Sequence, residues 1–506
     1  MPPLSWPRAL ALSALSGLLL APAILAQDLA VFAFLAYAPL YLAIQGQSPR
    51  RAALLGLLSG VVFSVPTYWW VAETIARFGG PGQPVSSLLV VALSVANAVR
   101  IAIPAWVAAR AAQRGWPEAL VFVLAFVGAE IGYPLFLPYY LGVGVVQALP
   151  LVQVAELGGM LAVDLVVITF AVGLGEALRA ARARRVPAVG AWVAMVAVPA
   201  LAWGWGAVRI AQVRVEMADA PSVHIGLVQP DVPAGGSDDV PWNREATLAL
   251  ADRGVELVLW PEVAVHTSFN EDTWRKRIPE RITSGLGVPV LFGTRTWEES
   301  PLAGEPRLRR NVAVLVDDAG VPIGRYDKHQ LVPFGEFIPF SDWFPVLRGV
   351  VDNDELFIPG AGVQPIEWGT HRIAALICYE DILPSYVNRH VSSVAPDLLV
   401  TITNDAWFGD TAEPWIHLTE ARIRAIEHRR YLVRSANSGP SGLVDPIGAL
   451  GDTSGLFVKE SRIVEARWMS GTTLYERIGD VPWWVAGVLA LVTAFARRPG
   501  SKADAR

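Results

Sequence analysis

Long runs of apolar residues, separated by short polar stretches, fill the first 208 positions of the chain, and one further run lies near its end. A helix needs roughly 20 apolar residues to cross a bilayer, and these runs have about that length. The pattern predicts eight membrane spans, near residues 9–26, 29–46, 52–72, 87–108, 118–137, 160–178, 188–208 and 482–497. We therefore expect three regions: seven spans in 1–214, a globular domain in 215–470, and a last span with a tail in 471–506.

Basic residues near the span ends predict the orientation of the chain, because loops rich in Arg and Lys stay in the cytoplasm. Clusters of arginine precede the first span and follow the second, fourth, sixth and eighth, as at Arg8, Arg50, Arg51, Arg110, Arg114, Arg179, Arg182, Arg184, Arg185, Arg497 and Arg498. The loops between these clusters are almost free of basic residues, Arg77 being the exception. Both termini are therefore expected in the cytoplasm, and the globular domain outside it.

Three features of the membrane region leave alternatives open. Residues 8–27 also resemble a signal peptide, whose cleavage would leave the remaining spans unchanged. Tyr139 and Tyr140 lie near a predicted outer span end, which is typical of an aromatic belt at the membrane surface. Glu130 in the fifth span is either functional or close enough to the span end to reach water.

The globular region, residues 215–470, has shorter apolar runs with helical patterns between some of them. Continuous apolar runs predict strands buried on both faces, at 223–229, 257–260, 288–292, 312–316, 372–377 and 398–402. Helical patterns at 243–254 and 412–430 lie between some of these runs, and residues 317–320 predict a hairpin turn. Strands mixed with helices in this way favour an α/β sandwich.

Polar residues directly follow several of the predicted strands. Glu262 follows the run 257–260, Cys378 follows 372–377, and Asn404 and Asp405 follow 398–402. Because ligands gather at the carboxyl ends of strands in such sheets, these positions predict a functional site.

Composition narrows the class of function. The net charge is −5 and no basic stripe occurs in 215–470, which argues against nucleic acid as a partner. The seven histidines show no zinc-type spacing, and the chain has no phosphate-binding glycine loop, so no metal or cofactor is predicted. The single cysteine, Cys378, rules out an internal disulfide; outside the cytoplasm it is either buried and inert or retained for its reactivity.

Three side chains suggest nucleophilic catalysis, and each also has a plain structural interpretation. A turn after a strand and a nearby cation would lower the pKa of the Cys378 thiol, whereas many free cysteines are simply buried. Glu262 in an apolar setting would suit a general base, although Pro261 before it also fits the first turn of a helix. Lys328 would support an oxyanion unless it lies on the surface, and His329 beside it invites a Cys–His pairing or a surface position.

Four local motifs carry a resemblance to a known family. They are Trp-Pro-Glu at 260–262, Tyr-x-Lys-x-x-Leu-Val-Pro-Phe-Gly-Glu at 326–336, Cys-Tyr-Glu at 378–380 and Asn-Asp-Ala-Trp-Phe-Gly-Asp at 404–410. A Glu, a Lys and a Cys in this order resemble the nitrilase superfamily. With seven predicted spans before the domain and one after it, nearly the whole chain resembles the apolipoprotein N-acyltransferases.

The resemblance implies an eight-span helical bundle in a bacterial inner membrane that carries a nitrilase-like αββα sandwich on its periplasmic side. It implies Glu262 as the general base, Lys328 as the oxyanion support and Cys378 as the nucleophile. Supporting roles are implied for Glu336, Tyr379, Glu380 and Trp242.

The same resemblance implies a reaction without a cofactor. An acyl chain leaves a membrane phospholipid, expected to be phosphatidylethanolamine, forms a thioester on Cys378, and passes to the amino group of a diacylglyceryl apolipoprotein. Apolar residues at 343–347 and at Trp407 and Phe408 are candidates for lids that exclude water or dip into the bilayer, or else they pack internally.

Two other functions remain open from the sequence. A membrane-tethered nitrilase-like amidase would use the same three residues to hydrolyse a carbon–nitrogen bond. A non-catalytic lipid-binding or transport protein would use none of them, although its spans would then be expected to contain more charged residues.

Overall fold

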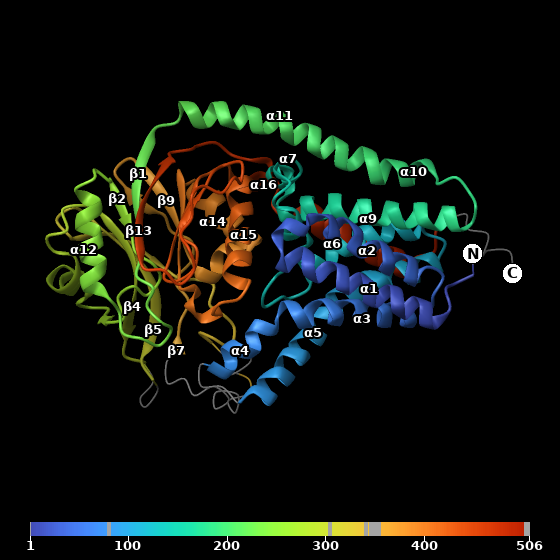
Figure 1. Cartoon of the computed structure of the whole chain (residues 1–506), viewed down its shortest axis with the longest axis horizontal. Coiled ribbons are helices and arrows are strands. Elements are labelled where there is room, and N and C mark those ends of the chain that lie inside the picture. The colour runs from blue at the N-terminus through green and yellow to red at the C-terminus, as the bar shows by residue number, and fades with distance from the viewer. Residues whose placement is uncertain (1, 78–81, 302–305, 338–342, 344–355, 500–506) are drawn as a thin grey trace. The chain divides into compact units, whose positions relative to one another are not determined.

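The computed structural model of the chain describes residues 2–77, 82–301, 306–337, 343 and 356–499. It divides into two compact units (Figure 1). Unit 1 comprises Met1–Ala211 and Ile478–Arg506, and unit 2 comprises Gln212–Arg477.

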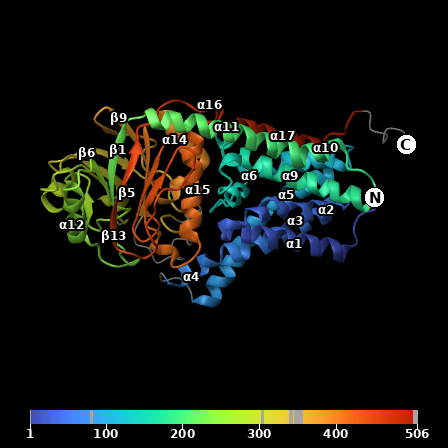
Figure 2. The ribbon, with the colours of Figure 1, turned by 45° about the horizontal axis from the view of Figure 1, so that its top comes forward.

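Unit 1 is helical in its described part. Its longer helices are α1 (Trp6–Leu25), α2 (Ala30–Ile44), α3 (Pro49–Thr67), α4 (Trp69–Arg77), α5 (Gln83–Ala112), α6 (Glu118–Gly132), α9 (Met160–Arg182), the start of α11 (Val198–Asp219) and α17 (Val481–Phe495). Three four-residue helices interrupt or flank them: α7 (Leu149–Val152), α8 (Ala155–Gly158) and α10 (Val189–Trp192). The last helix, α17, packs against α5 and α6 although it is distant from them in sequence (Figure 2).

Four helical segments of the described chain are long and apolar enough to cross a membrane: α1, α5, α9 and the run Val189–Asp219. Helices α3 and α4, bent by 47° at their junction, add a fifth if they form one span. The apolar helices α2 and α17 are shorter, at 15 residues each. Helix α11, which runs from unit 1 into the first residues of unit 2, continues to Asp219, beyond the predicted span end at 208. Several apolar helices are therefore found, while the count of eight spans and their orientation stay predictions.

A buried ion pair lies inside unit 1. Arg100 of α5 donates to Glu130 of α6 at 2.7 Å and to the carbonyl oxygen of Tyr139 at 3.1 Å. Glu130 therefore does not reach water, since its side chain is only 2% exposed. Tyr139 and Tyr140 are also buried, so the expected aromatic belt is wrong for these two residues. Their burial has a physical reason: the non-helical segment that follows α6 needs hydrogen-bond donors and acceptors from the surrounding protein.

Unit 2 contains two β-sheets. The first has the order β13-β1-β2-β4-β5-β6, with β3 beside β4 and β7 beside β5. Its strands are β1 (Ser222–Gln229), β2 (Leu257–Leu259), β3 (Ser268–Asn270), β4 (Val290–Glu298), β5 (Leu308–Val316), β6 (Pro322–Asp327), β7 (Leu356–Phe357) and β13 (Glu460–Arg467). The second sheet has the order β12-β11-β10-β9-β8, formed by β8 (Ile366–Trp368), β9 (His371–Ile377), β10 (Leu398–Thr403), β11 (Leu432–Ala436) and β12 (Gly442–Val444).

The two sheets pack face to face and helices cover both outer faces. One apolar core joins residues of both sheets, such as Ile225 and Leu259 with Ile377 and Val400. Helices α12 (Val240–Ala251) and α13 (Trp274–Ile278) cover the first sheet, and α14 (Pro384–Val394) and α15 (Glu413–His428) cover the second (Figure 1). The layers therefore follow the order α, β, β, α that the resemblance implies.

The six predicted strands and both predicted helices of this unit are found, and residues 317–320 connect the antiparallel pair β5 and β6. Strand β13, which pairs with β1, was not predicted. Its sequence Glu-Ser-Arg-Ile-Val-Glu-Ala-Arg lacks a continuous apolar run because most of its side chains are only partly buried at the edge of the sheet.

Candidate active site

The predicted catalytic residues come from both sheets. Glu262 lies just after β2, and Lys328 directly follows β6, both in the first sheet. Cys378 opens the short 3₁₀ turn η6 (Cys378–Ile382) directly after β9 in the second sheet. The site is therefore assembled across the interface between the sheets, where the ends of these strands meet.

Lys328 is a buried cation between two carboxylates. Its side chain is 1% exposed, and its Nζ lies 3.0 Å from Glu336 Oε1 and 3.4 Å from Glu262 Oε1. Burial alone would lower the pKa of Lys328, but Glu336, Glu262 and Cys378 outweigh it and raise this pKa above its usual value. Lys328 is therefore charged at neutral pH, and a surface position is excluded.

Glu262 is held by donors on each of its carboxylate oxygens. The Asn311 side-chain amide donates to Oε1 at 2.7 Å, and the backbone N–H of Asn404 donates to Oε2 at 3.0 Å. Asn311, on β5, also donates to Glu336 Oε1 at 3.2 Å. The carboxylate is thus fixed in one orientation, as a general base must be.

Gly293 on β4 gives the Glu262 turn the space it needs. A Cβ at this position would lie 2.5 Å from the backbone nitrogen of Val263 and 2.6 Å from Glu262 Cα, closer than real Cβ atoms approach. Val263 has a positive φ of 50°, so the turn has little freedom to move away.

We expect Gly293→Ala to displace Glu262 and to slow the enzymatic reaction at Cys378 by about 10- to 100-fold, because sub-ångström errors in catalytic geometry are costly. The measurement is the single-turnover rate at which substrate modifies Cys378. Gly204→Ala on α11, where a Cβ would meet nothing within 4 Å, is the matched control. An unchanged rate for Gly293→Ala would show that Glu262 tolerates the shift.

Two further carboxylates organise the site. Glu336 accepts from Lys328 and, through Oε2, from the backbone N–H of Val332 at 2.8 Å. Glu380 is fully buried and accepts from the Tyr326 hydroxyl at 2.7 Å. It also accepts from the backbone N–H groups of Ile377, His329 and Gln330 at 2.8–3.0 Å. Glu380 therefore ties the strand before Cys378 to the segment after Lys328.

Cys378 has a strained backbone and a protonated thiol. Its φ of 53° is in the left-handed region that non-glycine residues rarely adopt, and strain of this kind is common at functional sites. Burial and the neighbouring Glu262 raise the pKa of the thiol well above its usual range, and Lys328 only partly opposes them. The expectation of a lowered thiol pKa is therefore wrong: the cation is present, but burial and the carboxylates prevail. Such a thiol needs a base at the moment of attack.

We expect alkylation of Cys378 by iodoacetamide to keep accelerating with pH beyond the range in which ordinary thiols level off, about pH 8.5. The physical reason is that the raised pKa keeps the thiolate fraction small until the solution is strongly alkaline. Mass spectrometry of the Cys378 peptide, from about pH 6 to about pH 10, measures this rate. A plateau below the usual thiol pKa would contradict it.

Other predicted residues lie in different surroundings. The His329 Nδ1–H donates to the carbonyl oxygen of Gly360 at 2.7 Å, and the ring stacks on Tyr386, so the structure does not favour a Cys–His pairing. Trp242 is in the first turn of α12, where the Lys459 ammonium lies 4.9 Å from its ring centroid. Tyr379 is buried beside Cys378 in the turn η6. The supporting roles of Glu336, Tyr379, Glu380 and Trp242 stay predictions.

The expected lids are described only in part. Trp343 and Trp407 are 77% and 40% exposed, so they do not pack internally. Residues 344–347 lie outside the described part of the chain.

Known proteins match both units. The model of the apolipoprotein N-acyltransferase N-terminal domain matches residues 16–173, and the carbon–nitrogen hydrolase model matches residues 224–467. The apolipoprotein N-acyltransferase of Geobacter metallireducens is 30% identical, with 96% of this chain and 95% of that protein covered. The one of Azotobacter vinelandii is 32% identical, with 98% and 96% covered.

The chain belongs to the apolipoprotein N-acyltransferase family.

In this member of the family, the first match falls within unit 1 and the second within unit 2. Among solved structures, a nitrilase-superfamily amidase of Nesterenkonia AN1 is 18% identical, covers 52% of this chain and 96% of its own, and has a TM-score of 0.36.

Asn311 is a site residue that the sequence analysis missed. It bridges Glu262 and Glu336 from the middle of the apolar strand β5. The signal was available: an asparagine directly before the run Val312–Val316 is a polar residue entering a buried strand, and such residues need partners.

Proposed function

We propose that this chain is an apolipoprotein N-acyltransferase that works through a thioester on Cys378. The observation that carries the proposal is the meeting of the Cys378 thiol with the buried Lys328 and Glu262 in a chain of this family. Lys328 and Glu262 are buried, whereas the Cys378 residue keeps some exposure, so a substrate would meet Cys378 before the other two residues.

In the first half-reaction, Glu262 takes the thiol proton as Sγ attacks the ester carbonyl carbon of a phospholipid. The oxyanion that forms is stabilised by Lys328, whose charge is fixed by its two carboxylate neighbours. The carbon–oxygen ester bond then breaks, and Glu262 returns the proton to the departing lysophospholipid alcohol. An acyl thioester remains on Cys378.

In the second half-reaction, the amino group of a diacylglyceryl-cysteine attacks the thioester carbonyl. Glu262 accepts the proton of the amine, the carbon–sulfur bond breaks, and Cys378 leaves as a thiolate beside Lys328. The thiolate takes the proton back from Glu262. The product is an N-acylated lipoprotein, and the enzyme is unchanged.

The proposal extends to the donor and the location. We take phosphatidylethanolamine as the donor, and we place the chain in the bacterial inner membrane with eight spans, both termini cytoplasmic and the 215–470 domain periplasmic. The basic clusters at alternate loops support this orientation. The exposed Trp343 and Trp407 suit side chains that enter a bilayer surface, where both lipid substrates reside.

Mass spectrometry of the purified protein incubated with phosphatidylethanolamine tests the proposal. We expect one acyl mass on the peptide that contains Cys378, removable by neutral hydroxylamine, which then transfers to a diacylglyceryl-cysteine peptide. If the acyl group passes only to water, the amidase or hydrolase function is favoured instead. If folded protein acquires no acyl group, the phospholipid-donor mechanism fails.

A further inference from the structure

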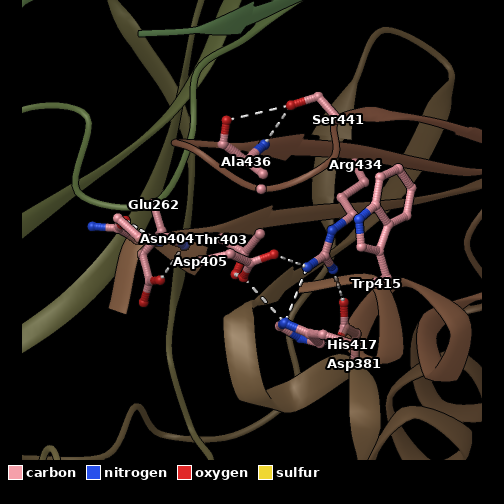
Figure 3. A network of polar contacts seen from close by, with 12 residues as sticks. Glu262, Asp381, Thr403, Asn404, Asp405, Trp415, His417, Arg434, Ala436 and Ser441 are labelled. Carbon is pink, nitrogen blue, oxygen red and sulfur yellow. Dashed lines mark hydrogen bonds and ion pairs between the residues drawn. The ribbon is translucent and has the colours of Figure 1, made fainter. Parts of the chain in front are cut away.

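A ring of four charged side chains lies behind the candidate active site in unit 2. Its members are Asp381, Asp405, His417 and Arg434, which we call the buried quartet (Figure 3). Their side chains are at most 4% exposed, and none belongs to the group that touches Lys328 or Glu262 directly. The proposed mechanism gives the quartet no step.

Each cation of the quartet joins the same two carboxylates. His417 of α15 contacts Asp381 through Nε2 at 2.8 Å and Asp405 through Nδ1 at 3.1 Å. Arg434 of β11 donates through one terminal nitrogen to Asp381 at 2.9 Å and through the other to Asp405 at 2.7 Å. Figure 3 shows the guanidinium and the imidazole between the two acids. The two aspartates are therefore held at one fixed separation.

Three members of the quartet, Asp405, His417 and Arg434, are charged at neutral pH. Burial and Arg434 both disfavour the charged imidazole, but Asp381 and Asp405 outweigh them and raise the pKa of His417 to about 10. Burial also opposes ionisation of Asp405, yet Arg434 and His417 hold its pKa far below the usual range. These three groups therefore keep their charges through the physiological pH range, and their contacts in the ring persist with them.

The two aspartates belong to the two turns that carry the proposed chemistry. Asp381 lies in the turn η6 that begins with Cys378, and Asp405 directly follows Asn404, whose N–H holds Glu262. These turns follow the parallel neighbours β9 and β10, in which Ile377 pairs with Ile402. Thr403, the last residue of β10, strengthens the link, because its side chain donates to Asp405 at 2.7 Å.

We propose that His417 and Arg434 are positioning residues for acyl transfer: by joining Asp381 to Asp405, they fix the turn of Cys378 against the turn that holds Glu262. This inference rests on the proposed function. The stability of the fold does not require such a ring, since proteins in which well-packed apolar residues replace buried ion pairs are often equally stable. The strained φ of Cys378, in contrast, persists only where surrounding contacts determine it.

The test compares acylation of Cys378 in full-length His417→Gln, Arg434→Met and Arg434→Lys variants with wild type, under single-turnover conditions with phosphatidylethanolamine. We expect the acylation rate constant to fall about 100-fold in Arg434→Met and in His417→Gln, while the lipid concentration at half-maximal rate changes less than about 3-fold. Lysine keeps the charge of Arg434 but reaches one aspartate at a time. Arg434→Lys should therefore regain most of the thermal stability and stay at least about 10-fold slow.

Arg422→Met is the matched control. Like Arg434, Arg422 is a buried arginine, but it lies on α15. It donates twice to the carbonyl oxygen of Gly448 rather than to the quartet. We expect this variant to lose stability and to keep its acylation rate when assayed below its unfolding temperature.

Three results would overturn the inference. They are normal acylation rates in folded His417→Gln and Arg434→Lys, an equal loss of acylation rate in Arg422→Met and Arg434→Met, or a change in the lipid concentration at half-maximal rate without a change in the rate constant. If Arg434→Met does not fold, Arg434→Lys decides the question. Wild-type protein distinguishes failure of this inference from failure of the proposed function. If wild type forms no acyl-enzyme, the proposed function itself fails. If wild type and variants are acylated equally fast, only the positioning role of His417 and Arg434 fails.

Discussion

Replacing Cys378 with serine is expected to lower N-acylation by at least about 10⁴-fold, the scale of loss seen when an enzyme nucleophile is removed. Serine is nearly the same size, so the left-handed backbone at this position and the packing of η6 should be preserved. A hydroxyl is far harder to deprotonate than a thiol, so Glu262, the proposed general base, would remove its proton much less readily.

The measurement is transfer of a labelled acyl chain to a diacylglyceryl-cysteine peptide, with near-ultraviolet circular dichroism to show that the variant is folded. The same variant separates the classes of function left open by the sequence. A lipid-binding or transport protein would retain lipid binding and transport after this change. Acyl transfer at the wild-type rate by the folded variant would rule out Cys378 as the nucleophile.

Lys328→Met is expected to reduce both activity and stability. Loss of one oxyanion donor costs about 10²- to 10³-fold in rate. The variant also leaves Glu262 and Glu336 buried without their cation, and removing one partner of a buried ion pair typically costs about 3–5 kcal/mol. The loss of stability is expected throughout the neutral range, because the raised pKa of Lys328 keeps the wild-type ammonium charged there.

Thermal unfolding between about pH 5 and about pH 8, together with single-turnover acylation, checks both parts of this expectation. Lys276→Met is the control in this lysine-poor chain, since the Lys276 side chain is 82% exposed and its nearest acid is 3.8 Å away. If Lys328→Met is as stable as the control and still acylates Cys378, Lys328 has neither role.

The sequence predicted those parts of unit 2 that depend on local patterns. Strands β9 and β10 are continuous apolar runs, and the polar residues that follow them in the chain do gather at one site. Asn311, His417 and Arg434 were missed because they reach the site from β5, α15 and β11, and only strand order and register bring these elements together. Arg434 did leave a signal, since an arginine directly after Leu432 and Val433 in a buried strand needs anionic partners.

In unit 1 the sequence predicted the helices but not the contacts between them. Its apolar runs predicted helices correctly, but hydropathy does not report how side chains pair inside a bundle. Tyr139 and Tyr140 therefore had the composition of a surface belt and the position of core residues. The pairing of Arg100 with Glu130 required two helices to be docked, which no local pattern encodes.

The pairing of β1 with β13 has a consequence for how the protein is made. Ser222, near the start of the unit, pairs with Arg467 near its other end, so the first sheet cannot be completed until almost the whole unit has been synthesised. Contacts of such long sequence separation form slowly. A nascent chain whose synthesis stops early therefore lacks the edge strand beside β1, and we expect the thiol to remain catalytically silent until biogenesis is nearly finished.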